Sequence, residues 1–317
     1  MKAHNPICLL FILLLPFLMQ AQGNRNNTLW AADWSKNGRY MAVGGDDQIL
    51  RVFDGKSYEL IFSDTLEGDI HRLRWHPTEN LLAVAGTGKA PRIVDFDWGR
   101  TIELDQLEEL SGRALAWSPA GDTLALGGYE KAISLWDKKG NLLREIPAVT
   151  GKSIVAIDWN PNNGNLIVLS EYVYEYTPEG QIVKKFRHRD EVVLMLTLAF
   201  HPSGDFYVIG DYGDFEKPYP PVLQYWFRDH QLDISWKKGK AEFRNVVWDR
   251  KGKKLATASD ALRVFDRKGK LLHEGLSPDK LWGVAWDKKG KRILTSSEKG
   301  VIAVWTKKAK LKQVILY

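Results

Sequence analysis

The sequence predicts an all-β protein, a seven-bladed β-propeller of four-stranded antiparallel blades, and two repeated patterns carry this prediction. The first pattern is an apolar run that ends in a large aromatic residue and is followed by a polar turn. Its seven marker residues are Trp34, Trp75, Trp117, Trp159, Phe200, Trp248 and Trp286. Successive markers are 41, 42, 42, 41, 48 and 38 residues apart. A period of about 40–45 residues with four short strands per unit is typical of propeller blades.

The second pattern is a short β-branched or aliphatic run that ends in an aromatic residue and often in Asp. Such a run is typical of a strand that leads into a turn. It occurs at residues 51–54, 93–96, 134–137, 172–176, 223–226, 263–266 and 303–306. Helical repeats are disfavoured, because each unit contains alternating or continuously apolar runs of strand length.

The aromatic–Asp endings and the period near 42 residues resemble the WD-repeat β-propeller family over about residues 28–317. This resemblance implies a platform for protein–protein contacts. The Gly-His pair that usually opens a repeat is absent, and Gly68-Asp-Ile-His71 is only loosely similar to it. This absence affects the buried His-Asp-Ser-Trp hydrogen-bond network that the resemblance implies. It does not affect the predicted fold.

Each unit can be divided into four strands. In blade 1 these are residues 29–34, 39–44, 49–53 and 58–62. The later blades begin at or near Ile70, Arg113, Ile154, Val193, Phe243 and Leu281. Residues 23–28 are polar and show no strand pattern, whereas residues 312–317 resemble an outer strand. We therefore expect blade 7 to supply all four of its strands, and the ring to close by side-chain packing between blades 1 and 7 alone.

Residues 1–22 have the layout of a secretory signal peptide. Lys2 precedes an apolar run at residues 7–19, which is too short to cross a bilayer as a helix, and Gln20-Ala-Gln22 follows. We expect one propeller domain at residues 23–317, secreted or periplasmic in a bacterium, without a membrane span in the mature chain. The single cysteine, Cys8, lies in the apolar run, so the mature chain would have no disulfide. The alternative is an uncleaved interfacial anchor.

Positive charge is concentrated near the C-terminus. Residues 236–317 hold 22 of the 45 Lys and Arg but only 8 of the 39 Asp and Glu. In a four-stranded blade the first and third turns lie on the same face of the ring, and the lysine-rich turns of blades 6 and 7 are of these two kinds. Such a patch attracts acidic partners. This candidate basic face consists of Lys251, Lys253, Lys254, Lys268, Lys270, Lys288, Lys289, Lys291, Arg292, Lys307 and Lys308. The alternative is a lysine surface that only aids solubility.

A second candidate surface lies on the opposite face. Residues 211–221 form an insertion in blade 5 that accounts for the spacing of 48 residues. Loops on a rigid scaffold often carry function, and aromatic side chains make good anchors for a partner. This candidate acidic-aromatic rim consists of Asp47, Tyr212, Asp214, Phe215 and Tyr219. The alternative is an insertion that folds back on its own blade.

Catalytic motifs are absent from the sequence, which has no nucleophile elbow, phosphate-binding glycine loop or His-Glu-x-x-His pair. His76 and His201 precede Pro at the same repeat position, which indicates a structural role in the turn. We interpret His188-Arg-Asp-Glu191 as a solvated loop rather than an acid–base site. We expect no enzymatic activity, cofactor, metal or nucleic-acid partner.

These patterns predict a non-catalytic binding scaffold for protein–protein interaction, in the cell envelope or outside the cell. One alternative is a binder of anionic envelope glycan or lipid headgroups through the basic face. The other is a propeller enzyme of the hydrolase or lactonase type, with a site at the mouth of the channel.

Overall fold

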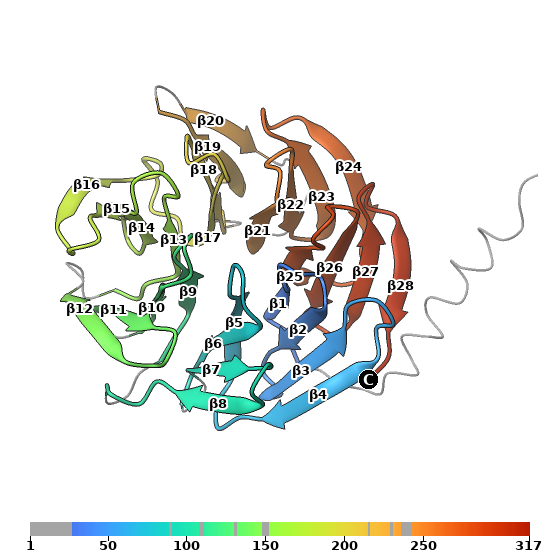
Figure 1. Cartoon of the computed structure of the whole chain (residues 1–317). Helices are drawn as coiled ribbons and strands as arrows, with labels where there is room; N and C mark the ends of the chain where they lie inside the picture. The colour runs from blue at the N-terminus through green and yellow to red at the C-terminus, as the bar shows by residue number, and fades with distance from the viewer. Residues whose placement is uncertain are drawn as a thin grey trace, which may run out of the picture.

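The computed structural model describes residues 27–88, 91–107, 111–129, 132–147, 152–214, 216–228, 231–235 and 242–317. The predicted signal peptide lies outside these ranges. The described residues form seven four-stranded antiparallel sheets, which are arranged as the blades of a ring (Figure 1). The predicted fold class is confirmed.

The strands of each blade follow one another from the inside of the ring outward. Blade 1 consists of β1 (Ala31–Trp34), β2 (Tyr40–Gly44), β3 (Ile49–Asp54) and β4 (Leu60–Thr65), and blade 2 of β5 (Ile70–Trp75), β6 (Leu81–Gly86), β7 (Arg92–Asp95) and β8 (Arg100–Glu103). Blade 3 consists of β9 (Ala114–Trp117), β10 (Thr123–Gly127), β11 (Ala132–Asp137) and β12 (Leu142–Pro147), and blade 4 of β13 (Ala156–Trp159), β14 (Leu166–Leu169), β15 (Val173–Tyr176) and β16 (Ile182–Phe186).

The remaining three blades have the same plan. Blade 5 consists of β17 (Met195–Phe200), β18 (Tyr207–Asp211), β19 (Val222–Trp226) and β20 (Gln231–Ser235), and blade 6 of β21 (Asn245–Trp248), β22 (Lys254–Ala258), β23 (Ala261–Asp266) and β24 (Leu271–Leu276). Blade 7 consists of β25 (Leu281–Trp286), β26 (Arg292–Ser297), β27 (Ile302–Thr306) and β28 (Leu311–Ile315). We call the side of the ring with the first and third turns of each blade the turn face, and the other side the loop face.

The outer strand of blade 1 differs from the prediction, since it begins at Leu60 rather than at residue 58. The carboxylate of Asp54 accepts hydrogen bonds from the backbone of Lys56 and Ser57, both at 2.8 Å. Tyr58 follows with a left-handed φ of 67°. The aspartate therefore lengthens the turn, and the strand starts later.

The marker aromatic residues join neighbouring blades. The indole nitrogen of Trp117 donates to the backbone oxygen of Arg74 in blade 2 at 3.1 Å, and that of Trp159 donates to Ala116 in blade 3 at 3.1 Å. Their rings are also buried in the cores between blades. Because each marker packs on the preceding blade, the aromatic residue recurs once per unit.

Small residues occur next to these markers for the same reason. Ala114 and Ala116 of β9 pack against Ile157 and Trp159 of blade 4, whereas Leu115 packs against blade 2. The side chains of a strand alternate between its two faces, so one row contacts each neighbouring blade. Large residues in both rows would hold the inner strands apart.

Two histidines form hydrogen bonds that connect the first turns of neighbouring blades. Nδ1 of His76 accepts the backbone N–H of Glu79 at 3.0 Å, and Nε2 donates to the backbone oxygen of Gly121 at 2.7 Å. His201 makes the equivalent contact with Gly252 in blade 6 at 2.8 Å. Gly121 has a φ of 81°, and a side chain there would also meet the imidazole of His76. The predicted structural role of both histidines is confirmed.

Replacing His201 with Gln is expected to reduce the sensitivity of the protein to acid. Burial lowers the pKa of His201 below its usual 6.5, so the folded protein takes up this proton less readily than the unfolded chain. The stabilisation is complete above about pH 6.5 and is lost as the pH falls below that value, by at most about 1.4 kcal/mol per pH unit. Urea unfolding of both proteins between ~pH 7.5 and ~pH 5 measures the difference between their free energies of unfolding. Titratable groups that the two proteins share contribute equally to both values and cancel in this difference. A constant difference would contradict the prediction.

Blade 7 supplies all four of its strands, as predicted, but its contact with blade 1 is more than side-chain packing. The backbone N–H of Leu29 donates to the backbone oxygen of Ser297 at 3.0 Å, and Oγ of Ser296 donates to the oxygen of Leu29 at 2.8 Å. Gly112 and Gly86 join blades 3 and 2 by the same kind of backbone bond at 2.7 Å. The prediction of closure by packing alone is therefore wrong. The entering backbone N–H needs an acceptor, and the preceding blade supplies it.

Parts of the buried network expected of a WD repeat are present in separate blades. In blade 7 the indole nitrogen of Trp305 donates to Oγ1 of Thr295 at 2.8 Å. In blade 5 Nε2 of His188 lies 3.3 Å from the carboxylate of Asp211. The fold therefore forms with these pairs distributed among blades.

Candidate binding surfaces

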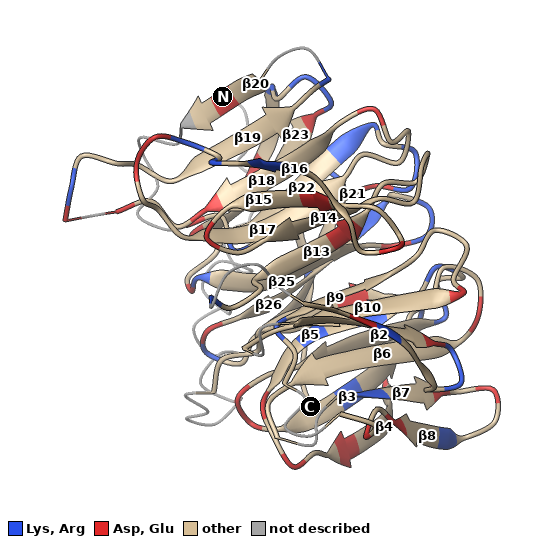
Figure 2. Cartoon of the chain, turned by 90° about the vertical axis from the view of Figure 1, so that its left-hand side faces the viewer, with Lys and Arg blue, Asp and Glu red and all other residues tan. Residues whose placement is uncertain are grey.

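The lysines of the basic face lie where the sequence placed them, on the first and third turns of blades 6 and 7. Figure 2 views the ring from its edge, so that the turn face and the loop face lie at opposite sides of the picture. The exposed members are Lys251, Lys253, Lys268, Lys270, Lys288, Lys289, Lys291, Lys307 and Lys308. Lys254 is half-buried, and burial together with the charges of Lys307 and Lys308 lowers its pKa. The two blades thus bring lysines distant in the sequence close together.

Aspartates hold these turns in fixed shapes. Asp249 accepts the backbone N–H of Lys253 at 2.6 Å, and Asp266 accepts that of Lys268 at 2.8 Å. Asp287 accepts the backbone N–H of Lys291 at 2.7 Å. Each carboxylate is engaged by its own turn, while the lysine side chains extend from a rigid backbone.

Arg292 differs from the other predicted members of the basic face, because it is part of the junction between blades 7 and 1. Its guanidinium donates to Asp287 at 3.0 Å, and to the backbone oxygen of Gly55 and the hydroxyl of Tyr58, both at 2.9 Å. It also lies 4.5 Å from the ring centre of Trp34. Its planar fork suits such multiple contacts, so Arg292 is engaged in the junction between the blades, unlike the exposed lysines of the basic face.

The structure does not bring the acidic-aromatic rim together as one site. Asp47, in blade 1, is only 8% exposed and forms an ion pair with Arg51 at 2.7 Å. The other members belong to blade 5, where Tyr212 is 43% exposed and Asp214 and Tyr219 are half-buried. Phe215 lies outside the described residues. Among the described members of the rim, Tyr212 is the most exposed.

The insertion in blade 5 is tied to its own blade by Asp211. This buried carboxylate accepts the backbone N–H of Gly213 at 3.1 Å and that of Val222 at 2.7 Å, at the two ends of the insertion. Nη1 of Arg189 donates to the same carboxylate at 3.1 Å and to the backbone oxygen of Pro220 at 3.2 Å. The described part of the insertion therefore folds back on blade 5.

The interpretation of residues 188–191 as a solvated loop is also wrong. His188 is 5% exposed, and Arg189 forms ion pairs with Glu191 at 2.8 Å and with Asp211. Hydrogen bonds from Arg189 lower the pKa of Glu191. The sequence showed the charges but not their partner, because Asp211 follows more than 20 residues later. This cluster supports the insertion.

A surface that the sequence reasoning missed lies at the loop-face ends of the inner strands. It is found by counting four residues back from each marker, which identifies Trp30, His71, Arg113, Val155, Leu196, Arg244 and Trp282. At His71, Leu196 and Trp282 the strand pairing shifts register, as at a β-bulge. A bulge points a side chain in a direction that differs from the regular alternation of a β-strand.

Five side chains at this end form a cluster that we call the aromatic mouth: Trp30, His71, Tyr129, Arg244 and Trp282. The ring centres of Trp30 and Trp282 are 4.2 Å apart, and those of Trp30 and His71 are 5.9 Å apart. The guanidinium of Arg244 lies 3.8 Å from the ring centre of Trp282, and His71 lies 6.3 Å from Tyr129. The cluster therefore extends over five adjacent blades, from blade 6 through blade 1 to blade 3.

Two hydrogen-bond donors of the aromatic mouth, Nη1 of Arg244 and Nε1 of Trp282, are buried and lack an acceptor among the described residues. Nδ1 of His71 is also buried without a partner there, and its tautomer decides whether it donates or accepts. Nη1 of Arg244 lies 3.9 Å from the carboxylate of Glu298, and the other side of the guanidinium pairs with Glu242. Burial, followed by the charge of Arg113, lowers the pKa of His71. An acceptor from a bound molecule would satisfy these donors.

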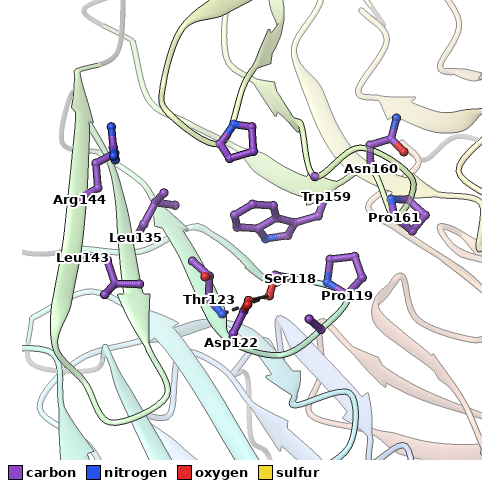
Figure 3. A pocket seen from close by; sticks show the side chains of 13 residues that line it. Ser118, Pro119, Asp122, Thr123, Leu135, Leu143, Arg144, Trp159, Asn160 and Pro161 are labelled. Atoms are coloured by element: carbon purple, nitrogen blue, oxygen red, sulfur yellow. Dashed lines mark hydrogen bonds between the residues drawn. The ribbon is translucent and has the colours of Figure 1, made fainter.

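A separate hollow of about 500 Å³ lies on the turn face between blades 3 and 4. Figure 3 shows the indole of Trp159 inside it, with Leu135 and Pro161 among the lining residues. Oγ of Ser118 donates to Asp122 at 2.6 Å at its edge. The lining is mostly apolar, which suits an apolar side chain better than a charged ligand.

The described residues also bear on the requirements for metal binding and for a membrane-spanning helix. Within the described ranges, no group of three or more His, Cys, Asp and Glu side chains is arranged to hold a metal ion. The described part of the chain also contains no helix with the length and apolar character needed to span a membrane.

Known proteins resemble parts of this chain. Residues 17–54 match the family model "WD domain, G-beta repeat", and residues 42–172 match "Eukaryotic translation initiation factor eIF2A". The WD repeat-containing protein AAC3 of Dictyostelium discoideum is 26% identical over an alignment of 223 residues, which covers 59% of this chain and 45% of that protein. Minichromosome loss protein 1 of Schizosaccharomyces pombe is 30% identical over 40% of this chain and 17% of its own length.

A third relative is Protein transport protein sec13 of Aspergillus oryzae, which is 31% identical over 31% of this chain and 37% of its own length. The chain thus matches less than half the length of each of these relatives. All three are eukaryotic, so they give no support to a bacterial origin. The seven repeats, the seven four-stranded blades and these matches together support a WD-repeat propeller.

Proposed function

We propose that the protein is a non-catalytic scaffold that binds a protein partner at the aromatic mouth. The similarity to WD-repeat proteins supports a role in protein interaction. The observation that carries the location is the cluster of Trp30, Trp282 and Arg244 with its unpaired donors. Trp, Tyr and Arg are the residue types that most often dominate the free energy of protein binding.

The unpaired donors indicate which chemistry the partner presents. A buried donor without an acceptor costs about 1–3 kcal/mol, and a bound acceptor removes that cost. The partner therefore places carboxylate or carbonyl oxygens near Arg244 and Trp282, and an apolar group against the two indoles. A segment with an acidic residue beside an apolar one has both features.

Replacing Trp282 with Ala is expected to weaken binding of the partner by about tenfold or more, because it removes an aromatic anchor that contacts both Trp30 and Arg244. Tyr129→Ala, at an exposed edge of the same cluster, provides a second variant. The matched control is Trp98→Ala, since Trp98 is 80% exposed in the third turn of blade 2 on the turn face. Cross-linking and quantitative capture from native extract compare the variants, and circular dichroism confirms their folding. Equal capture by wild type and both mouth variants would refute this location.

The basic face supports a second candidate function, the binding of anionic glycan or lipid headgroups. The supporting observation is the close approach of Lys254, Lys307 and Lys308 across blades 6 and 7. Lys289→Glu with Lys291→Glu is expected to lower the salt concentration that elutes the protein from a sulfated polymer. Lys184→Glu with Lys185→Glu, on the outer strand β16, makes the same charge change elsewhere. If both pairs of substitutions lowered the elution salt concentration equally, the effect would come from net charge alone, and a binding site on the basic face would be excluded.

We also propose export of the chain, with residues 1–22 as a signal peptide. The support is the apolar run at residues 7–19 and the small residue Ala21 beyond it. N-terminal sequencing of the protein from its source is expected to begin at Gln22 or Gly23. A mature chain that begins at Met1 would contradict cleavage and favour the uncleaved anchor.

A further inference from the structure

We propose that the cavity at the turn-face end of the inner strands binds a small oxyanion with more than one negative charge. This channel cavity has a volume of about 580 Å³, and residues from the inner strands and first turns of all seven blades line it. The volume lies in the range usual for small-molecule sites, about 300–1,000 Å³. The cavity is distinct from the aromatic mouth, which lies at the opposite end of the inner strands.

Four basic residues are among those that line the channel cavity: Lys36, Arg74, Arg250 and Lys288. None of them forms an ion pair with a carboxylate in the part of the chain that the structure describes. Arg74 donates to the backbone oxygen of its neighbour Leu73 at 3.0 Å, and a guanidinium has five N–H donors. Lys36, Arg250 and Lys288 are at first turns, where flexible side chains can reach the cavity.

The carboxylates in the lining are already engaged. Asp33 accepts the backbone N–H of Trp34 at 2.9 Å and that of Trp75 at 2.7 Å. Asp158 is held in the same way by Trp159 at 2.9 Å and Phe200 at 2.7 Å.

The other two aspartates of the lining hold the lysine-rich turns. Asp249 and Asp287 accept the backbone N–H groups of Lys253 and Lys291. The lining therefore combines bound acceptors with available charged donors, and it favours an anion as its ligand.

The charged residues along the inner strands also favour a negatively charged ligand. Burial and the charges of Arg74 and Arg113 lower the pKa of Arg72 to about 9. Arg72 donates to the backbone oxygen of Leu196 in blade 5 at 3.3 Å, so it reaches across the ring. Burial raises the pKa of Asp158, and both of its carboxylate oxygens are already bonded to backbone N–H groups. An anion in the channel cavity would offset this excess.

Titration with inorganic pyrophosphate, followed by calorimetry and tryptophan fluorescence, tests the proposal. Trp34, Trp75 and Trp117 line the cavity, so their emission is expected to change with saturable 1:1 binding. Arg74→Gln with Lys288→Gln is expected to weaken binding by about tenfold or more. Lys288→Gln alone, at an exposed position, guards against a folding defect of the double variant and is expected to weaken binding to a smaller extent.

Lys307→Gln with Lys308→Gln is the matched control, because it removes the same charge from the same face outside the lining. This pair is expected to leave the dissociation constant within about threefold. Citrate, as a carboxylate probe, distinguishes the source of the anion: binding of either probe that depends on Arg74 and Lys288 supports the site. The proposal is overturned if neither probe binds saturably, or if both double variants weaken binding equally. This outcome is independent of whether a protein partner binds the aromatic mouth.

Discussion

Removal of residues 313–317 is expected to produce an aggregating protein of much lower thermal stability. These residues include most of the pairing of β28 with β27, in which Gln313, Val314 and Ile315 face Val304, Ala303 and Ile302. The cut would turn β27, an apolar and buried strand, into an open edge with free backbone N–H and C=O groups. Such an edge readily pairs with another chain.

The truncation also removes contacts between blades 7 and 1. Ile315 is 2% exposed in a core that contains Leu29 and Phe53 of blade 1, and the ring of Tyr317 lies 6.4 Å from that of Phe53. The C-terminus lies beside blade 1 (Figure 1). Loss of one such isoleucine side chain typically costs about 2–5 kcal/mol.

Size-exclusion chromatography with light scattering, together with thermal unfolding, measures the effect of this truncation. Leu316→Ser is the control, because this side chain is 55% exposed and follows β28. We expect the control to behave as wild type. A monomeric truncated protein with an unchanged melting temperature would show that β28 is not needed to close the ring.

Replacing Arg292 with Ala is expected to lower the free energy of unfolding by about 2–4 kcal/mol. The change removes the hydrogen bonds to Gly55 and Tyr58 of blade 1 and leaves the carboxylate of Asp287, which is 5% exposed, without its ion pair. Arg292→Lys keeps the charge but not the planar fork, so an intermediate loss is expected.

Urea unfolding of these variants is compared with that of Lys291→Ala, which removes an exposed charge from the neighbouring position. A surface substitution of this kind usually changes stability by less than about 0.5 kcal/mol. Similar values for Arg292→Ala and Lys291→Ala would mean that Arg292 is an ordinary surface charge after all.

The markers predicted the blades well because each copy is a local pattern with one structural task. Trp117 and Trp159 end their inner strands and bond back to the preceding blade in the same way. The lysine turns were placed correctly for the same reason, since a turn between two recognised strands can lie on only one face. Seven copies of one pattern made the number and order of strands readable.

Side chains with partners in another blade were less predictable. Arg292 looked like one more turn cation, because Tyr58 and Gly55 lie more than 230 residues away in the sequence. Asp211 and Arg189 are likewise separated in the chain but paired in space. In each case the exposure of a charged side chain depends on a partner that the repeat pattern does not identify.

The sequence by itself determined the seven-bladed fold, the strand order and the face that carries the lysine turns. These follow from local periodicity and from short connections within each blade. Only the tertiary structure decided how the ring closes and which charges are paired. It also decided that Trp30, His71, Arg244 and Trp282, each four residues before a marker, form one cluster at one end of the inner strands. Ring geometry brings distant positions together there, and their packing and hydrogen bonds depend on all seven blades at once.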